Sequence, residues 1–171
     1  MPLSPAPRLE KLGTARLTAA ATSLTLDIPA REVLIVQGLV TGLSASDTVA
    51  MRFNGATTNY WYRTLHAVQG VATVTNGQAV STTQILLDQI AGTGALVFRC
   101  EISNRLATSK TMTHRSQRST GSAATAGGLH LTCGGEWVNT TAQITQIQIK
   151  STGGTATLSA DTHFAVFGSN V

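Results

Sequence analysis

The chain has 171 residues, of which 12% are charged, and it carries a formal net charge of +4 at neutral pH. This length suits a single domain that buries its core without disulfide staples. Charged residues are about half as frequent as in an ordinary soluble domain, so we expect partners to cover part of the surface. No apolar run approaches the roughly 20 residues of a membrane helix and no signal peptide is visible, which predicts a protein assembled in a cytoplasm without a membrane partner.

The N-terminal segment differs from the rest of the chain because it contains three prolines, which prevent regular hydrogen bonding and favour an extended backbone. We predict an extended Pro-rich arm over residues 1–12 and one β-sandwich domain over residues 13–171. The arm is expected to lie on a neighbouring subunit. Its candidate contact residues are Pro2, Leu3, Pro5, Pro7, Leu9 and Leu12.

The first strands of the domain have clear patterns. Residues 23–28 alternate polar and apolar side chains with the period of two that a half-buried strand requires. Residues 32–40 form a denser apolar run, which is typical of a central strand. Residues 47–53 alternate again and end at Asn54-Gly55, a strong turn signal.

Further strands follow to the end of the chain. They are predicted at residues 59–67, 71–75, 82–88, 96–102, 129–133, 143–150, 156–159 and 163–167. Turns or strand breaks are predicted at Asn76-Gly77, Gly134-Gly135 and Gly153-Gly154. The least patterned stretch is residues 105–128, where we expect a polar edge strand over residues 108–115 and a loop over residues 121–128.

The succession of elements indicates the fold class. No window longer than about eight residues places apolar side chains at a helical period. About ten short strands separated by turn signals are typical of an antiparallel sandwich or barrel. We therefore predict an all-β protein, an antiparallel β-sandwich of jelly-roll type. Its 27 threonines agree with this, because β-branched residues favour strands.

Two cysteines, Cys100 and Cys133, are too few for a disulfide framework. Buried free thiols are the first interpretation, and one bridge between them is the alternative.

His130 and Cys133, joined by His114, have a spacing compatible with zinc. On a strand, however, an odd spacing places His130 and Cys133 on opposite faces, so we predict neither a metal site nor a cofactor.

Cations gather in one stretch of the sequence, with only Glu101 opposing them. They are Arg99, Arg105, Lys110, Arg115 and Arg118. A phosphate-binding patch is one interpretation. The other is a solvated loop, or arginines that pair with acids of a neighbouring subunit. Because no aromatic residues are interleaved, we predict no nucleic-acid partner and take Arg115 and Arg118 as candidate interface residues.

Catalytic residues have no recognisable frame in this sequence. The four histidines are scattered, no Gly-x-Ser-x-Gly elbow is present, and the eight acids include no close pair typical of a glycoside hydrolase. We predict a protein that is not an enzyme.

In the run Tyr60-Trp61-Tyr62 the tyrosines share one strand face and Trp61 takes the other, which favours core tyrosines and leaves stacking on sugars or a partner as the alternative. Trp137 is expected in the core or an interface.

One motif resembles a known group of proteins. The run Met51-Arg52-Phe53-Asn54-Gly55, a short loop, and then Asn59-Tyr60-Trp61-Tyr62 resembles a motif of tailed-bacteriophage virion structural proteins. Residues 24–40, 134–137, 142–147 and 163–168 also resemble segments of that group. Ala56-Thr57-Thr58 departs from its usual Asp-Thr-Gly type of loop, so a ligand role of the loop does not carry over. The motif residues expected to be structural are Arg52, Asn54, Gly55, Tyr60 and Tyr62, with a positive-φ turn at Asn54-Gly55 and cross-strand pairing by Arg52.

The resemblance implies a β-sandwich protein of the virion. The expected function is a capsid decoration (cement) protein, which stabilises the head by binding between shell subunits. Its expected partners are the major capsid protein or other virion proteins and further copies of itself, as a homo-oligomer for which we expect a trimer. The alternative is a receptor- or glycan-binding module of a tail or head fibre, which would use Tyr60, Trp61 or residues 115–128.

Overall fold

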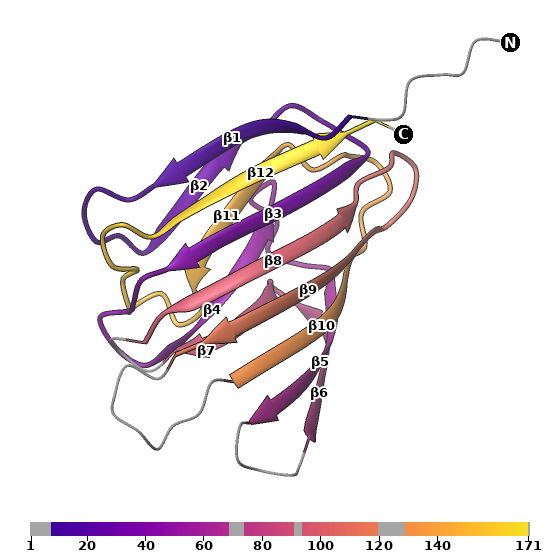
Figure 1. Ribbon diagram of the computed structural model, residues 1–171. Coiled ribbons are helices and arrows are strands. Elements are labelled where there is room, and N and C mark those ends of the chain that lie inside the picture. Colours follow the sequence, from indigo (N-terminus) through magenta and orange to yellow (C-terminus); the bar gives the residue numbers. More distant parts are fainter. Residues whose placement is uncertain (1–7, 69–73, 91–93, 120–128, 171) are drawn as a thin grey trace, which may run out of the picture.

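The computed structural model describes residues 8–68, 74–90, 94–119 and 129–170 (Figure 1). These residues form twelve strands in two sheets, and every pair of neighbouring strands is antiparallel. The predicted all-β sandwich is therefore confirmed, while its jelly-roll form stays a prediction. The described residues contain no helix, and so none that could span a membrane.

The large sheet has eight strands in the spatial order β1-β12-β3-β8-β9-β10-β5-β6. Their bounds are Glu10–Arg16 (β1), His163–Ser169 (β12), Val33–Val40 (β3), Leu96–Ser103 (β8), Lys110–Arg118 (β9), Leu129–Trp137 (β10), Tyr60–Val68 (β5) and Val74–Thr82 (β6). The small sheet has four strands in the order β2-β11-β4-β7. Their bounds are Ser23–Asp27 (β2), Gln146–Ser151 (β11), Asp47–Phe53 (β4) and Ile85–Ile90 (β7). In Figure 1 the small sheet lies behind the large one, and β5 and β6 form one end of the large sheet.

The core lies between the two sheets and is made by alternate side chains of their strands. Those that are almost fully buried include Leu34, Val36, Val49, Met51, Phe98, Ile147, Ile149, Phe164 and Val166. At one end Phe53, Tyr60 and Trp137 pack together, with ring centroids 5.9–6.2 Å apart. The core interpretation of Tyr60 and Trp137 is thus confirmed.

The domain begins earlier in the chain than predicted. β1 starts at Glu10 and pairs with β12, so residues 10–12 belong to a strand rather than to the arm. Leu12 packs against the core and Leu9 is 46% exposed. Pro2, Leu3, Pro5 and Pro7 lie outside the described residues, as does the predicted loop at residues 121–128.

Two predicted turns are wrong because both lie inside strands. Asn76-Gly77 falls in β6, where Gly77 pairs with Thr64. Gly134-Gly135 falls in β10, which pairs along its whole length with β9 and β5. A Cβ on Gly135 would stand 3.2 Å from Ile85 Cδ1 and 3.3 Å from Met112 Cγ, so this glycine serves close packing rather than chain reversal.

Two strand predictions also need correction. The polar strand expected over residues 108–115 is β9, which lies between β8 and β10 and is not an edge. Residues 156–159 form no strand, and Leu158 makes only isolated bridges to Ala21 and Leu43.

The edge of the small sheet is joined to the large sheet by side chains of β9. His114 Nε2 lies 3.1 Å from the Leu87 carbonyl oxygen, to which Ser116 Oγ also donates at 2.8 Å. Arg118 donates to the Gln89 carbonyl. We call this contact the β7–β9 seam. It satisfies carbonyls of β7 that have no neighbouring strand on that side.

Candidate functional site on the outer face of the large sheet

The outer face is the side of the large sheet that turns away from the small sheet. Antiparallel register places its side chains in rows that cross the sheet. One row carries Gln37, Arg99, Arg115, Thr132, Leu65 and Asn76. A second row carries Ile35, Glu101, Thr113, Gly134, Arg63 and Gln78. Two hollows on this face contain the side chains most suited to binding.

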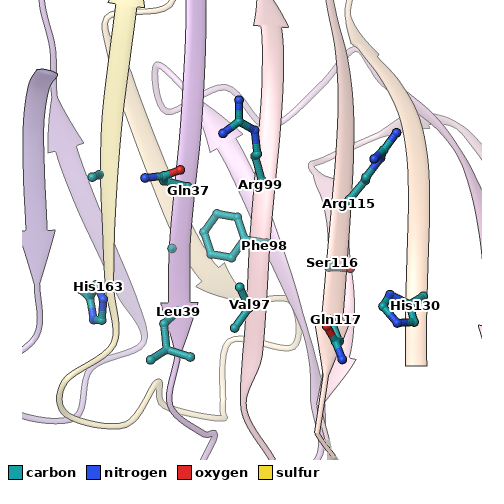
Figure 2. Close-up of a pocket in the computed structure, with 12 residues that line it drawn as sticks. Gln37, Leu39, Val97, Phe98, Arg99, Arg115, Ser116, Gln117, His130 and His163 are labelled. Carbon is teal, nitrogen blue, oxygen red and sulfur yellow. The ribbon is translucent and has the colours of Figure 1, made fainter. Parts of the chain in front are cut away.

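The first hollow, of about 590 Å³, crosses β12, β3, β8, β9 and β10 and is shown in Figure 2. Leu39 and Val97 lie between its two histidines, His163 and His130, while Arg99 and Arg115 lie at its other end. We call it the arginine hollow. Its composition is cationic, and Phe98, the residue of Phe, Tyr or Trp type among the described residues that line it, is buried.

Arg99 and Arg115 are direct cross-strand partners. Arg99 Nη2 lies 3.2 Å from Glu101 Oε1, whereas Arg115 has no hydrogen-bond or ion-pair partner among the described residues. Like charges placed opposite one another on neighbouring strands destabilise a sheet. This pair therefore gives the arginine hollow a local positive field that is only partly neutralised.

The five cations grouped by the sequence do not form one patch. Lys110 is buried and donates to the Arg105 carbonyl at 2.7 Å. Arg118 belongs to the β7–β9 seam, where its Nη1 lies 3.8 Å from Asp88 Oδ1. The candidate interface residue Arg115 is exposed, while Arg118 is engaged within the fold.

The second hollow, of about 460 Å³, lies over β10, β5 and β6 and contains Trp61. We call it the tryptophan hollow. Trp61 is 48% exposed, while its neighbour Tyr60 is fully buried, as the period of two predicted. The polar residues around Trp61 are Arg63, Gln78, Thr111 and Glu136. Burial raises the pKa of Tyr62, which is half-buried and packs against the core.

A further hollow of about 740 Å³ continues from this one and shares Arg63, Gln78 and Gly134 with it. It extends along β5 and β6 to Leu65 and Asn76. A Cβ on Gly134 would meet no atom within 4 Å. The missing side chain of Gly134 therefore leaves the floor of both hollows at the level of the backbone.

The phage-like motif has a structural role in the fold. Asn54 and Gly55 have φ angles of 50° and 68°, which confirms the positive-φ turn. Asn54 Oδ1 accepts hydrogen bonds from the Thr145 and Gln146 N–H groups, both at 2.9 Å. Arg52 Nε donates to the Thr83 carbonyl at 3.1 Å. The motif thus ties the end of β4 to the start of β11 and to the segment before β7.

Cys100 and Cys133 are both buried and free, and the strand of His114 lies between theirs. Neighbouring strands are about 4.8 Å apart, so the Cα atoms of the two cysteines are separated by roughly twice that distance. A disulfide requires Cα atoms within about 7 Å, which rules out the bridge. Burial raises the pKa of Cys133 to about 12 and that of Cys100 as well.

His114 and Cys133 point into the core, whereas His130 is on the outer face. The zinc alternative that combined these three residues is therefore wrong. Within the described ranges no group of three or more histidine, cysteine or acidic side chains is placed to hold a metal ion. Burial lowers the pKa of His114 to about 4, so this imidazole is neutral at physiological pH.

Comparison with protein-family models gives no match, and comparison with curated proteins gives none either. The resemblance to tailed-phage virion proteins therefore stays a prediction that rests on the motif residues.

Proposed function

We propose that this chain is a structural protein of a tailed-bacteriophage particle, a capsid decoration protein that binds between shell subunits and stabilises the head. The motif resemblance supports the class of protein. The single observation that carries an assembly role is the character of the sheet edge formed by β6.

β6 is a nine-residue edge strand, VTNGQAVST, without a charged residue or a proline. Val74 and Val80 on this strand are 62% and 61% exposed. Natural proteins protect long edge strands with charges, prolines or a covering segment, because unpaired N–H and C=O groups invite another strand. Exposed apolar side chains along such an edge are typical of a contact with a partner.

The other three sheet edges differ from β6. β1 carries Glu10, Lys11 and Arg16, and β2 ends in Asp27. The free edge of β7 is covered at the β7–β9 seam. This contrast favours β6 as the edge that pairs with another virion protein, and we propose the major capsid protein as that partner.

The strand order supports a virion role in a second way. If the two hairpin pairs β5–β6 and β9–β10 are set aside, the sheets are β1-β12-β3-β8 and β2-β11-β4-β7. That is the order of an eight-stranded jelly roll, a fold common in viral capsid proteins. We propose a jelly roll in which two inserted hairpins widen one sheet. A homo-oligomer, with the trimer as its expected form, and contact of the arm residues with the shell belong to the same proposal.

The proposal is tested on phage particles that carry or lack the chain. Particles without it should lose genome at a lower temperature while still adsorbing to cells, because a protein that binds only the assembled shell stabilises it. The double variant V74K/V80K should fold but fail to join particles, while T14K on the charged edge β1 should join them normally. Particles that lack the chain and keep full heat resistance would contradict the decoration role.

A second candidate function is the receptor- or glycan-binding module of a tail or head fibre. The exposed indole of Trp61 in a polar hollow favours it. This function predicts the opposite particle phenotype: without the chain, particles keep their heat resistance and lose adsorption to host cells.

A further inference from the structure

We infer that the tryptophan hollow is a saccharide-binding site, in which a neutral pyranose ring stacks on Trp61 and its hydroxyl groups bond the polar side chains around it. This inference specifies a ligand for the second candidate function, the receptor- or glycan-binding module. It rests on that function only where the saccharide is assigned to the surface of a host cell. The saccharide site and the β6 edge adjoin one another, because Val80 of β6 also lines the tryptophan hollow; strand pairing at β6 itself would occur in the plane of the sheet.

The stacking surface is the indole of Trp61. Trp61 is 48% exposed although it lies within β5, next to Tyr60, which is fully buried. A large aromatic side chain left in water at such a position costs hydrophobic free energy, and an exposed apolar surface with a polar rim is typical of a binding site. The C–H groups on one face of a pyranose ring match a flat aromatic surface of this kind.

Gly134 provides the space in which a ring can lie. In the register of the sheet it stands between Arg63 on β5 and Thr113 on β9, where any other residue would project a side chain. The position is open, because an added Cβ would touch nothing within 4 Å. A ligand stacked on Trp61 can therefore approach the backbone of β10.

The polar side chains around this space suit hydroxyl groups. Arg63 Nη2 lies 3.3 Å from Gln78 Oε1, so two planar groups stand next to one another on β5 and β6. Glu136 is the cross-strand partner of Trp61, with Thr111 beyond it on β9. Planar amide, guanidinium and carboxylate groups can each bond two adjacent hydroxyls.

Charge separates this site from the arginine hollow. Arg63, the cross-strand partner of Gly134, and Glu136, two residues further along β10, carry opposite charges in this hollow, so the local field is close to neutral and favours an uncharged sugar. The arginine hollow has Arg99 and Arg115, which suit an anion, and its Phe98 ring is buried, so it lacks an exposed indole or phenyl surface like that of Trp61.

The dimensions allow more than one ring. The tryptophan hollow has about 460 Å³, within the range of about 300–1,000 Å³ usual for small-molecule sites. The adjoining hollow adds about 740 Å³ and shares Arg63, Gln78 and Gly134. The geometry therefore fits an oligosaccharide that runs from Trp61 along β5 and β6 towards Leu65 and Asn76.

The experiment screens the purified chain on an array of defined neutral and acidic oligosaccharides and then titrates the best binder by intrinsic fluorescence. The chain has two tryptophans, and Trp137 is only 3% exposed, so a change on binding reports Trp61. W61A lacks this reporter and is titrated by calorimetry beside the parent; it should weaken binding at least tenfold. G134V, whose Cβ enters open space, should weaken it to a similar extent while thermal unfolding stays unchanged.

V97A is the matched control, since Val97 is an exposed apolar side chain in the arginine hollow, and it should bind like the parent. The inference is overturned if no oligosaccharide binds, if only acidic ones bind, or if G134V keeps parental affinity. Particles that carry G134V separate the site from the function. If the isolated variant loses sugar binding and its particles still adsorb normally, the site stands and the receptor function fails.

Discussion

The hydroxyl of Tyr60 accepts a hydrogen bond of 2.8 Å from the backbone N–H of Phe53, seven residues earlier in the chain. The same hydroxyl lies 3.3 Å from the Phe53 carbonyl, so it satisfies the end of β4 where the ladder stops. Burial raises the pKa of Tyr60 to about 12 although the hydrogen bond from Phe53 lowers it. Tyr60 therefore stabilises the Asn54-Gly55 turn of the motif by bonding Phe53, the residue just before it.

Replacing Tyr60 by phenylalanine should lower the free energy of unfolding by about 1–3 kcal/mol, because a buried N–H loses its partner while the ring packing remains. Urea denaturation followed by circular dichroism measures the change. W61F, which alters an exposed ring on the next residue, should unfold like the parent. Equal stability of Y60F and the parent would show that this hydrogen bond contributes nothing.

The contribution of Asn54 to stability has a backbone part and a side-chain part, which two substitutions can separate. Its side chain bonds the N–H groups of Thr145 and Gln146 and the carbonyl of Gln143, while its φ of 50° favours asparagine or glycine. N54G keeps the conformation and loses the bonds, at a cost of about 1–3 kcal/mol. N54A should lose about 1 kcal/mol more through backbone strain. If thermal denaturation reversed this order, the strain component would be refuted.

His114 should make the fold sensitive to mild acid. Burial depresses its pKa in the folded chain from 6.5 to about 4, although the bond to the Leu87 carbonyl opposes that shift. The unfolded state therefore binds a proton first, and this contribution to stability is complete above pH 6.5 and is lost as the pH falls towards 4. The loss between pH 7.5 and 5 is about 2 kcal/mol.

The measurement is the free energy of unfolding in urea at both pH values, for the parent, H114Q and H130Q. Burial raises the pKa of the neighbouring Asp88, whose protonation in the fold acts in the opposite direction, so the difference between parent and H114Q isolates the histidine. H114Q should lose less stability on acidification than the parent. H130Q, which changes an exposed histidine, should follow the parent; a parent and H114Q with identical pH dependence would contradict the assignment.

Gly38 and Gly134 are predicted to respond oppositely to the same substitution. A Cβ on Gly38 would lie 2.6 Å from the His163 carbonyl oxygen and 2.7 Å from Phe164 Cβ, atoms that cannot move without shifting β12. G38A should therefore lower stability by about 1–3 kcal/mol or more. G134A meets open space and should be neutral or slightly stabilising. A differential scanning calorimetry comparison would reject this explanation if the two variants melted together.

Side-chain periodicity predicted the strands whose inward positions are apolar. β8 alternates buried and exposed residues along nearly its whole length, and the Asn54-Gly55 turn is where its residue types require it. β9 was placed at an edge because its sequence is polar. Its inward residues Lys110, His114 and Ser116 are nonetheless buried, since they bond carbonyls of a loop and of β7. Inward-facing residues that are polar produce no alternation of apolar and polar side chains, so the sequence pattern could not show that β9 is an interior strand.

The candidate site was predictable only in part. Period two placed Trp61 opposite to Tyr60 and Tyr62, and the structure puts it on the outer face. The space beside Trp61 depends on Gly134, which a sequence pattern assigns to a turn because glycine is frequent there. Its place in the middle of β10 follows from pairing with β5 and β9, which are distant in the chain.

The order of strands has a consequence for synthesis on the ribosome. β12 lies between β1 and β3, and β11 lies between β2 and β4. Each sheet therefore has a gap until residues 146–169 have left the exit tunnel. Pairings this distant in sequence form late and slowly, and an unfinished chain exposes strand edges that promote aggregation. Nascent chains that stop before Gln146 lack an interior strand of both sheets, so the two sheets cannot be completed before β11 and β12 have emerged.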